Sequence, residues 1–256
     1  MSYKAGLDIG SFQAKAVIMN AQGILAYAVA PISGGFQQAA GQVLQEALEK
    51  CGLQQNQLDL IGVTGLGASF FNHPSTRHTE VSCQSRGIKY LLPTTRLFIE
   101  IGDQASRIIK LTQGGKIADC VINDRCATGS GRILRIIARV LRTSVPDMGE
   151  LSLRAANPVR FSTGCAVFTE TEAISRIAEG AQVEDIVAGL HHAIALKIFS
   201  MLQKVKIEGD CAVTGGGAKD AGLVRLLAET IGKSLLVPDE PLISGSVGAA
   251  LMATEN

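Results

Sequence analysis

Two segments of this chain repeat an acid, a glycine turn and a base at the same spacing. In the first, Asp8 precedes a Gly-Ser turn and Lys15 follows it; in the second, Glu100 and Arg107 stand 92 positions further along. A glycine turn between two strands directs consecutive backbone N–H groups at one point, which is how proteins build a nest for an anion. Glycine permits the close approach that phosphate requires. The repeat therefore indicates two phosphate-binding turns.

The residue types around these turns suit the hydrolysis of a nucleotide. Mg²⁺ usually takes one or two carboxylates and keeps several waters, so Asp8 and Glu100 are sufficient as ligands. An ordinary hairpin with an acid at its turn explains either segment alone equally well, and the repetition favours the functional interpretation. The candidate catalytic residues are Asp8, Glu100 and Gln104, and the candidate nucleotide-binding residues are Gly10, Ser11, Lys15, Gly102, Gly215, Gly216 and Gly217.

A second repeat pairs two glycine-rich segments. The segment 62–68 resembles the segment 212–218 at an offset of 150, so the second half carries about 58 additional residues between its two motifs. Gly215, Gly216 and Gly217 follow a predicted strand and precede a predicted helix, where backbone can approach a ribose or phosphate at the positive end of the helix. A plain strand-to-helix loop is the alternative.

Two cysteines, Cys126 and Cys165, lie within these additional residues, and a predicted helix follows each. A helix N-terminus favours the thiolate form that binds metals. Iron–sulfur clusters usually need four thiolates, so two chains related by a two-fold axis would have to share one cluster. Two buried apolar cysteines are the alternative, and spacing alone favours that alternative.

Short apolar runs and helical patterns alternate along the chain, which predicts an α/β protein. Residues 6–10 and 15–19 form a predicted hairpin, and 36–51 a helix that ends at Gly52. The other predicted strands are 61–64, 97–101, 107–111 and 211–214, and the other predicted helices are 131–141, 167–178, 183–205, 220–231 and one that begins at 245.

Composition excludes several classes of protein. The net charge of +1 and the 4% of aromatic residues do not indicate a nucleic-acid partner. No signal peptide or apolar run approaching 18 residues is evident, which predicts a cytoplasmic protein with no membrane partner. The six cysteines include no C-x-x-C pair, so neither a zinc ribbon nor a disulfide framework is expected.

The motifs together resemble one family over almost the whole chain. The sequence is similar to the ATPase activators of 2-hydroxyacyl-CoA dehydratases and the related ATPase subunits of benzoyl-CoA reductase, in the superfamily of acetate and sugar kinases, Hsp70 and actin. The matching segments are 6–11 with Lys15, 63–67, 80–83, 123–132, 165–175, 214–216 and 245–250. The Asn-Asp-basic-Cys-Ala motif at Cys126 and the Cys-x-Val-Phe-x-Glu motif at Cys165 are the most specific of these.

The resemblance implies a duplicated actin-like (ribonuclease H-like) ATPase fold with two lobes around a nucleotide cleft. The first lobe would span residues 1–92, with a helix at 245–254 returning to it. The second would span 93–244 and carry a cluster-binding insert at about 118–178. Cys83 also matches a family position and is expected to be structural.

The resemblance further implies the cofactors and partners. Cys126 and Cys165 from each of two subunits would hold one 4Fe–4S cluster per dimer, in a homodimer or a paralogous heterodimer, with ATP or ADP and Mg²⁺ in each subunit. ATP would then drive an electron from the cluster into a dehydratase or reductase component. A ferredoxin or flavodoxin would supply that electron.

The second phosphate turn departs from the family pattern Asp-Ile-Gly-Gly-Gln-Asp. Glu100 is one methylene longer than aspartate, and Ala105 lacks a carboxylate. Asp103 replaces a glycine and adds bulk and a negative charge near the phosphates. Gln104 is retained from the family pattern and can orient the attacking water, as glutamines do in other nucleotide hydrolases. Nucleotide binding with slow or absent hydrolysis is therefore expected. Three functions stay open: an electron-transferring ATPase, a nucleotide-binding and cluster-bearing subunit without useful hydrolysis, and a small-molecule kinase of the same superfamily.

Overall fold

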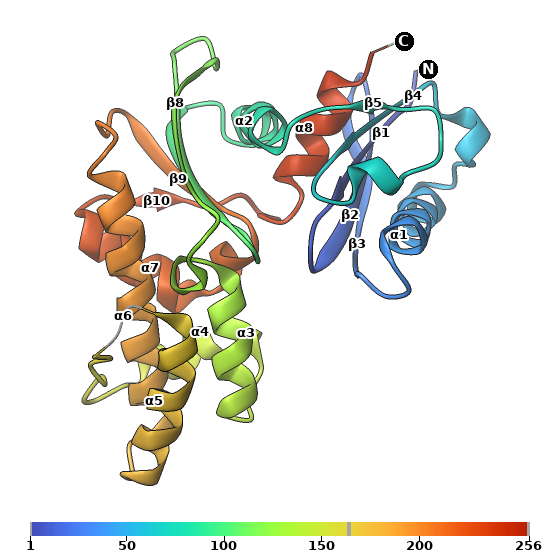
Figure 1. Ribbon diagram of the computed structural model, residues 1–256. Coiled ribbons are helices and arrows are strands. Elements are labelled where there is room, and N and C mark those ends of the chain that lie inside the picture. Colours follow the sequence, from blue (N-terminus) through green and yellow to red (C-terminus); the bar gives the residue numbers. More distant parts are fainter. Residues whose placement is uncertain (1, 163–164, 255–256) are drawn as a thin grey trace. The chain divides into compact units, whose positions relative to one another are not determined.

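The computed structural model describes residues 2–162 and 165–254, and the chain divides into two compact units (Figure 1). Unit 1 consists of Met1–Thr95, Leu111–Ile117 and Pro238–Asn256, and unit 2 of Arg96–Lys110 and Ala118–Val237. Each unit is built around its own five-stranded sheet.

The sheet of unit 1 has the strand order β3-β2-β1-β4-β5. Its strands are β1 (Lys4–Ile9), β2 (Gln13–Asn20), β3 (Gly23–Pro31), β4 (Leu60–Thr64) and β5 (Thr76–Arg77). The first three strands pair antiparallel, whereas β4 runs parallel to β1. The predicted hairpin and the predicted strand at 61–64 are thus confirmed.

Helix α1 (Phe36–Cys51) covers one face of this sheet (Figure 1). Its buried side chains recur every three or four residues and face the strands: Ala39, Ala40, Val43, Leu44, Ala47 and Leu48. Gly52 ends the helix in the left-handed conformation at φ 70°, where glycine carries no steric penalty. The prediction for residues 36–51 is therefore confirmed at both ends.

The opposite face of the sheet packs against α8 (Ser244–Met252), which lies beside α2 (Glu80–Leu91). Four glycines allow backbone to touch backbone here. A Cβ at Gly6 or Gly62 would collide with the carbonyl groups of α8, and a Cβ at Gly248 would collide with the carbonyl of Cys83. Gly87 meets Ser244 in the same way. The small residues at these contacts thus permit backbone to pack directly against backbone.

We expect Gly248→Ala to destabilise the protein by about 3 kcal/mol or more, because the new methyl group would meet a backbone oxygen that cannot rotate away. Gly41→Ala is the matched control: Gly41 lies in α1 with nothing within 4 Å of its added Cβ. That change should stabilise the protein by roughly 0.5–1 kcal/mol through helix propensity. Urea unfolding followed by circular dichroism measures both. Equal stability of the two variants would contradict the packing described for α8.

Unit 2 repeats the sheet with the order β10-β9-β6-β7-β8. Its strands are β6 (Thr95–Ile101), β7 (Ser106–Leu111), β8 (Ile117–Asn123), β9 (Asp210–Thr214) and β10 (Leu235–Leu236). Strands β6, β7 and β9 therefore occupy the places that β1, β2 and β4 hold in unit 1. The predicted duplication of the α/β fold is present in both sheets.

The segment between β8 and α6 (Val183–Leu202) is far longer than the loop 32–35 between β3 and α1. It holds α3 (Gly131–Val140), α4 (Val145–Leu153) and α5 (Ala166–Ala178), of which α4 was not predicted. The lower part of unit 2 in Figure 1 shows α3, α5 and α6 side by side.

Helix α6 supplies much of the core of unit 2. Among the described residues it is the one helix whose length and composition would allow it to cross a membrane, but 61% of its apolar window is buried inside the protein. It packs against α4 and α7 (Ala221–Ile231). Such burial is typical of a core helix.

Candidate functional site

The first phosphate turn lies at the end of the β1–β2 hairpin in unit 1. Asp8 and Lys15 are register partners across the two strands, and Lys15 Nζ lies 3.2 Å from Asp8 Oδ2. The backbone N–H of Gly10 donates to the carbonyl of Gln13 at 3.0 Å and closes the turn. Ser11 is partly exposed at the tip. The arrangement places an acid and a base beside a tight, accessible backbone turn.

The second turn, in unit 2, has the same construction. Glu100 and Arg107 are register partners on β6 and β7, and Arg107 Nη1 lies 2.7 Å from Glu100 Oε2. Gly102 donates to the carbonyl of Ala105 at 3.0 Å, as Gly10 does in unit 1. Gln104 is exposed at the tip. The 92-residue repeat in the sequence thus corresponds to two equivalent hairpins.

A glycine loop packs behind each turn. Gly65 (φ +91°) and Gly67 lie against Ile9 in unit 1, and Gly215 (φ +83°) and Gly217 lie against Ile101 in unit 2. A Cβ at any of the four would press on the isoleucine or its carbonyl. Close packing against the neighbouring strand therefore accounts for these glycines.

Gly216 differs from its two neighbours. It is exposed at the start of a 3₁₀ turn, whereas Gly217 is buried and Gly215 half-buried. Of the three predicted nucleotide-binding glycines, Gly216 is thus the one with the most accessible backbone. The other two give the loop its shape.

The environment of Asp8 includes Gln84 and Ser244, two residues that the sequence did not indicate as part of the site. A Cβ at Gly245 would lie 2.9 Å from Asp8 Oδ2 and 3.0 Å from Gln84 Nε2. Ser244 Oγ donates to Gln84 Oε1 at 2.6 Å, and both side chains are buried. The N-terminus of α8 therefore backs directly onto the acid of the first turn, where its dipole favours negative charge. The Gly-x-x-Gly spacing at 245–248 was the available signal.

The charge that Asp103 adds to the second turn has a partner in the structure. Asp103 Oδ1 lies 2.5 Å from Nη2 and 2.7 Å from Nε of Arg135 on α3. The charge of Asp103 is therefore compensated within unit 2.

The two candidate metal ligands are partly or fully accessible. Cys126 is half-buried immediately before the 3₁₀ turn Ala127–Gly129, and Cys165 is exposed as the N-cap of α5. The alternative of two buried cysteines does not hold for Cys165. Within residues 2–162 and 165–254, no three His, Cys, Asp or Glu side chains are grouped as a metal site.

The remaining cysteines are less suited to bind metal. Burial raises the pKa of the Cys83 thiol to about 11 and that of the Cys211 thiol to about 12. Burial also raises the pKa of Cys120. The Cys51 thiol donates to carbonyl oxygens of its own helix. A buried, protonated Cys83 agrees with the expected structural role.

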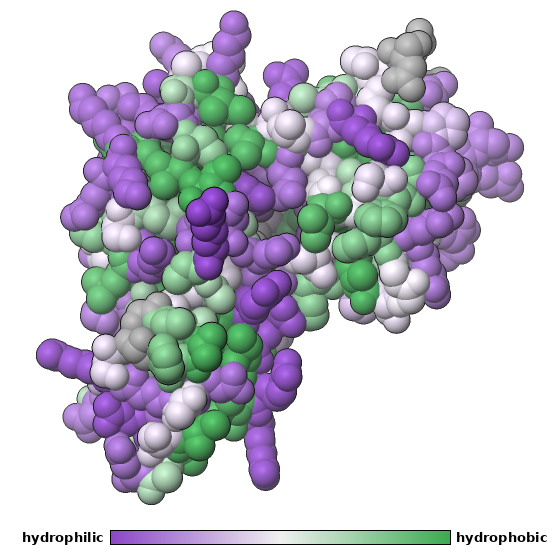
Figure 2. All heavy atoms as spheres, in the orientation of Figure 1, coloured by the Kyte–Doolittle hydropathy of each residue, from purple (hydrophilic) through white to green (hydrophobic). Residues whose placement is uncertain are grey.

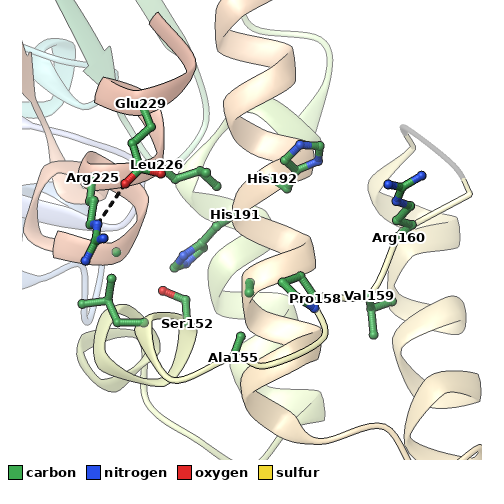
Figure 3. Close-up of a pocket in the computed structure, with 13 residues that line it drawn as sticks. Ser152, Ala155, Pro158, Val159, Arg160, His191, His192, Arg225, Leu226 and Glu229 are labelled. Carbon is green, nitrogen blue, oxygen red and sulfur yellow. Dashed lines mark hydrogen bonds and ion pairs between the residues drawn. The ribbon is translucent and has the colours of Figure 1, made fainter. Parts of the chain in front are cut away.

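A pocket of about 520 Å³ lies elsewhere in unit 2, beside α4, α6 and α7 (Figure 3). At its wall, His191 Nε2 lies 2.9 Å from Asp220 Oδ2, and both side chains are buried. Asp220 also caps α7 by accepting a hydrogen bond from Leu223 N. None of the residues that line this pocket is a predicted site residue. The pocket is therefore separate from the two turns and the two cysteines.

Comparison with known proteins places these features in a family. The sequence model of the BadF/BadG/BcrA/BcrD ATPase family matches residues 5–253. The chain belongs to this family. The match includes both phosphate turns, both glycine loops and both candidate cysteines.

Its relatives include proteins with named roles. The chain is 36% identical over 252 residues to the 2-hydroxyisocaproyl-CoA dehydratase activator of Clostridioides difficile, covering 98% of this chain and 94% of the relative. It is 32% identical over 263 residues to a subunit of the benzoyl-CoA reductase of Thauera aromatica, covering 98% and 93%. The predicted family resemblance is thus confirmed.

The fold agrees with a solved structure of the family. The activator of the 2-hydroxyisocaproyl-CoA dehydratase from Clostridium difficile, determined with bound ADPNP, superposes with a TM-score of 0.93 at 35% identity, covering 97% of this chain and 93% of that one. The duplicated α/β architecture is the actin-like ATPase fold, as predicted.

Proposed function

We propose that this protein is an ATP-dependent reductive activator that passes a low-potential electron to a dehydratase or reductase acting on CoA esters. The observation that carries this proposal is the pair Cys126 and Cys165. Cys165 is exposed and Cys126 half-buried, each at the start of a helical segment, in a chain whose relatives are named as dehydratase activators and as part of a benzoyl-CoA reductase. A kinase of the same superfamily would have no use for these thiols.

The donor set of one chain fits half of a 4Fe–4S cluster. Two accessible thiols supply two of the four thiolates that such a cluster usually needs. A second chain, identical or paralogous, would supply the other two. A cluster bound there would provide one-electron chemistry at low potential.

The surface beside Cys165 supports a second chain at this place. Four apolar side chains of α5 are exposed, and two of them, Val167 and Phe168, lie two and three residues after Cys165 with 72% and 63% of their surface accessible. The other two are Ile174 and Ile177. Figure 2 shows apolar side chains on the surface of unit 2 where α5 lies. Burying such a patch favours association, and exposed apolar clusters of this kind commonly mark interfaces.

Nucleotide would bind through the two turns and Gly216. The backbone N–H groups at the tips of the two turns, beyond Gly10 and Gly102, would hold phosphates, and Lys15 would offset their charge. Asp8 and Glu100 would hold Mg²⁺, and Gln104 would orient water. Because Glu100 is longer than aspartate and Ala105 lacks a carboxylate, the proposed hydrolysis is slow.

A second candidate is a cluster-bearing protein that acts by nucleotide binding alone. The altered second turn specifically favours it, since both turns keep their closed backbone geometry while the catalytic acid differs. Steady-state phosphate release from Mg-ATP separates the two candidates: turnover that Asp8→Ala abolishes supports the activator, and binding without turnover supports the second candidate.

We expect protein purified without oxygen to be brown and to contain about four iron atoms per two chains. Iron and sulfide analysis, together with the molar mass from light scattering, measures this directly. The expected electron donor is a ferredoxin or flavodoxin, and ATP should be needed for the electron to leave. A colourless monomer after cluster reconstitution would rule out the proposed cofactor while leaving the ATPase assay interpretable.

A further inference from the structure

The second phosphate turn is attached to the segment that follows Cys126. Gly131 N donates to the carbonyl of Gly102 at 2.8 Å, and Arg132 N donates to the carbonyl of Asp103 at 3.0 Å. The buried Ser106 Oγ donates to the carbonyl of Gly129. The carbonyl groups of the turn thus accept hydrogen bonds from the first two N–H groups of α3. Together with the bond from Ser106 on β7, these hydrogen bonds join the second phosphate turn to residues 129–132.

The same segment carries Cys126. Asn123 Nδ2 donates to the carbonyl of Cys126 at 2.8 Å, and Gly129 N donates to that carbonyl at 3.4 Å. Only residues 127–130 separate Cys126 from Gly131, whose N–H binds the phosphate turn, and three of them form the 3₁₀ turn Ala127–Gly129. We call residues 126–131 the cysteine loop. A displacement of the phosphate turn therefore has a direct route to the cysteine loop through hydrogen bonds already in place.

A charged pair reinforces this attachment one turn further along α3. Asp103 Oδ1 accepts from Nε of Arg135 at 2.7 Å, and Nη2 lies 2.5 Å away. The two side chains are 16% and 29% exposed, so solvent screens the pair only in part. In the first turn, Ser11 occupies the equivalent position. The acid and its arginine are thus features of the second turn alone.

We propose that Asp103 and Arg135 are positioning residues that couple phosphate at the second turn to the cysteine loop. This inference rests on the proposed binding of nucleotide at that turn. Arg135 neutralises Asp103, so that a polyphosphate can approach Gly102, and it fixes the start of α3 to the turn. When phosphate displaces the turn, the cysteine loop moves with it.

The two roles of Arg135 predict an uneven response to mutation. Arg135→Ala should weaken the binding of ADPNP with Mg²⁺ about tenfold, because an uncompensated carboxylate would remain beside the phosphates. The double variant Asp103→Asn with Arg135→Ala should bind nearly as tightly as the wild type. A merely structural pair would give no such rescue, since both variants would lose the same contact.

A second measurement follows Cys126 directly and needs no cluster. The rate at which a thiol reagent labels Cys126 in the iron-free protein, read by peptide mass spectrometry, should change severalfold when ADPNP is added to the wild type. The double variant should show a clearly smaller response although it still binds nucleotide, because only the backbone hydrogen bonds of Gly131 and Arg132 and the bond from Ser106 then join the turn to the loop. Arg225→Ala removes an exposed pair with Glu229 on α7 and is the matched control, with wild-type binding and labelling expected.

The outcomes separate this inference from the proposed function. If the wild type does not bind ADPNP, both fail. If the wild type binds and Arg135→Ala binds equally well, or if the double variant keeps the full labelling response of the wild type, the coupling is wrong and the activator proposal stands. Arg135→Lys keeps the charge and loses the two-nitrogen contact, so it should retain affinity and lose part of the response. That variant keeps the test decisive should Arg135→Ala fail to fold.

Discussion

Cys126→Ser and Cys165→Ser are each expected to remove the iron from the protein almost completely. Two chains would supply four thiolates to the shared cluster. Because each chain carries the substitution, one changed residue removes one thiolate from each chain, and thus two of the four ligands. Serine is nearly the same size as cysteine but binds iron weakly, and neither position is part of the buried core. The measurement is the iron content and visible absorbance of protein prepared without oxygen.

Cys51→Ser provides the matched control for these variants. Cys51 is half-buried at the end of α1, and its thiol already donates to the carbonyls of Ala47 and Leu48, which a hydroxyl can do equally well. Full iron content is expected in this variant. Wild-type iron in Cys165→Ser would contradict the proposed ligand set, whereas loss of iron in all three variants would point to general instability of the protein.

A regular period of apolar residues was sufficient to predict one long helix. Helix α1 was predicted at both ends because its apolar stripe recurs at helical spacing and a glycine follows it. Strands β3 and β8 were not predicted as partners in their sheets. The accessibility of β8 does not alternate along the strand, and Cys120 within it was assigned to the insert. An edge strand with little burial carries a weak signal in the sequence.

Two helices escaped prediction for a related reason. The buried face of α2 is made of Cys83, Gln84, Ser85, Gly87 and Ile88, which contains few large apolar residues. Gly87 and its neighbours are buried because α8 approaches them closely, and that contact joins segments far apart in the chain. Helix α4 buries only Met148 and Gly149. Tertiary packing, which local periodicity cannot report, decides such elements.

The candidate site divides in the same way. Equal spacing in the two halves was sufficient to predict that Asp8 and Glu100 occupy equivalent positions, because a hairpin fixes which residues face each other. The sequence did not indicate that positions 215 and 217 must be glycine because Ile101 packs against them. Nor did it indicate that Arg135 pairs with Asp103, which lies 32 residues away in the chain. Both facts depend on contacts between separate elements.

Glu100→Asp is expected to raise the steady-state rate of ATP hydrolysis by up to about 100-fold. The shorter acid would withdraw the carboxylate by about one ångström, and errors of that size at a catalytic group can cost a factor on the order of 100. The first turn already combines an aspartate with a base at the equivalent register position, so the hairpin geometry accommodates the shorter side chain. Phosphate release from Mg-ATP measures the effect.

Two controls define what this result would mean. Glu100→Gln keeps the length and removes the charge, so it should show no gain, and Asp8→Glu makes the reverse change in the first turn and should lower the rate. If Glu100→Asp hydrolyses ATP no faster than the wild type while binding ADPNP equally well, the length of the acid is not what limits turnover. The absent carboxylate at Ala105 would then be the remaining difference in this turn, and Ala105→Asp would be expected to raise the rate instead.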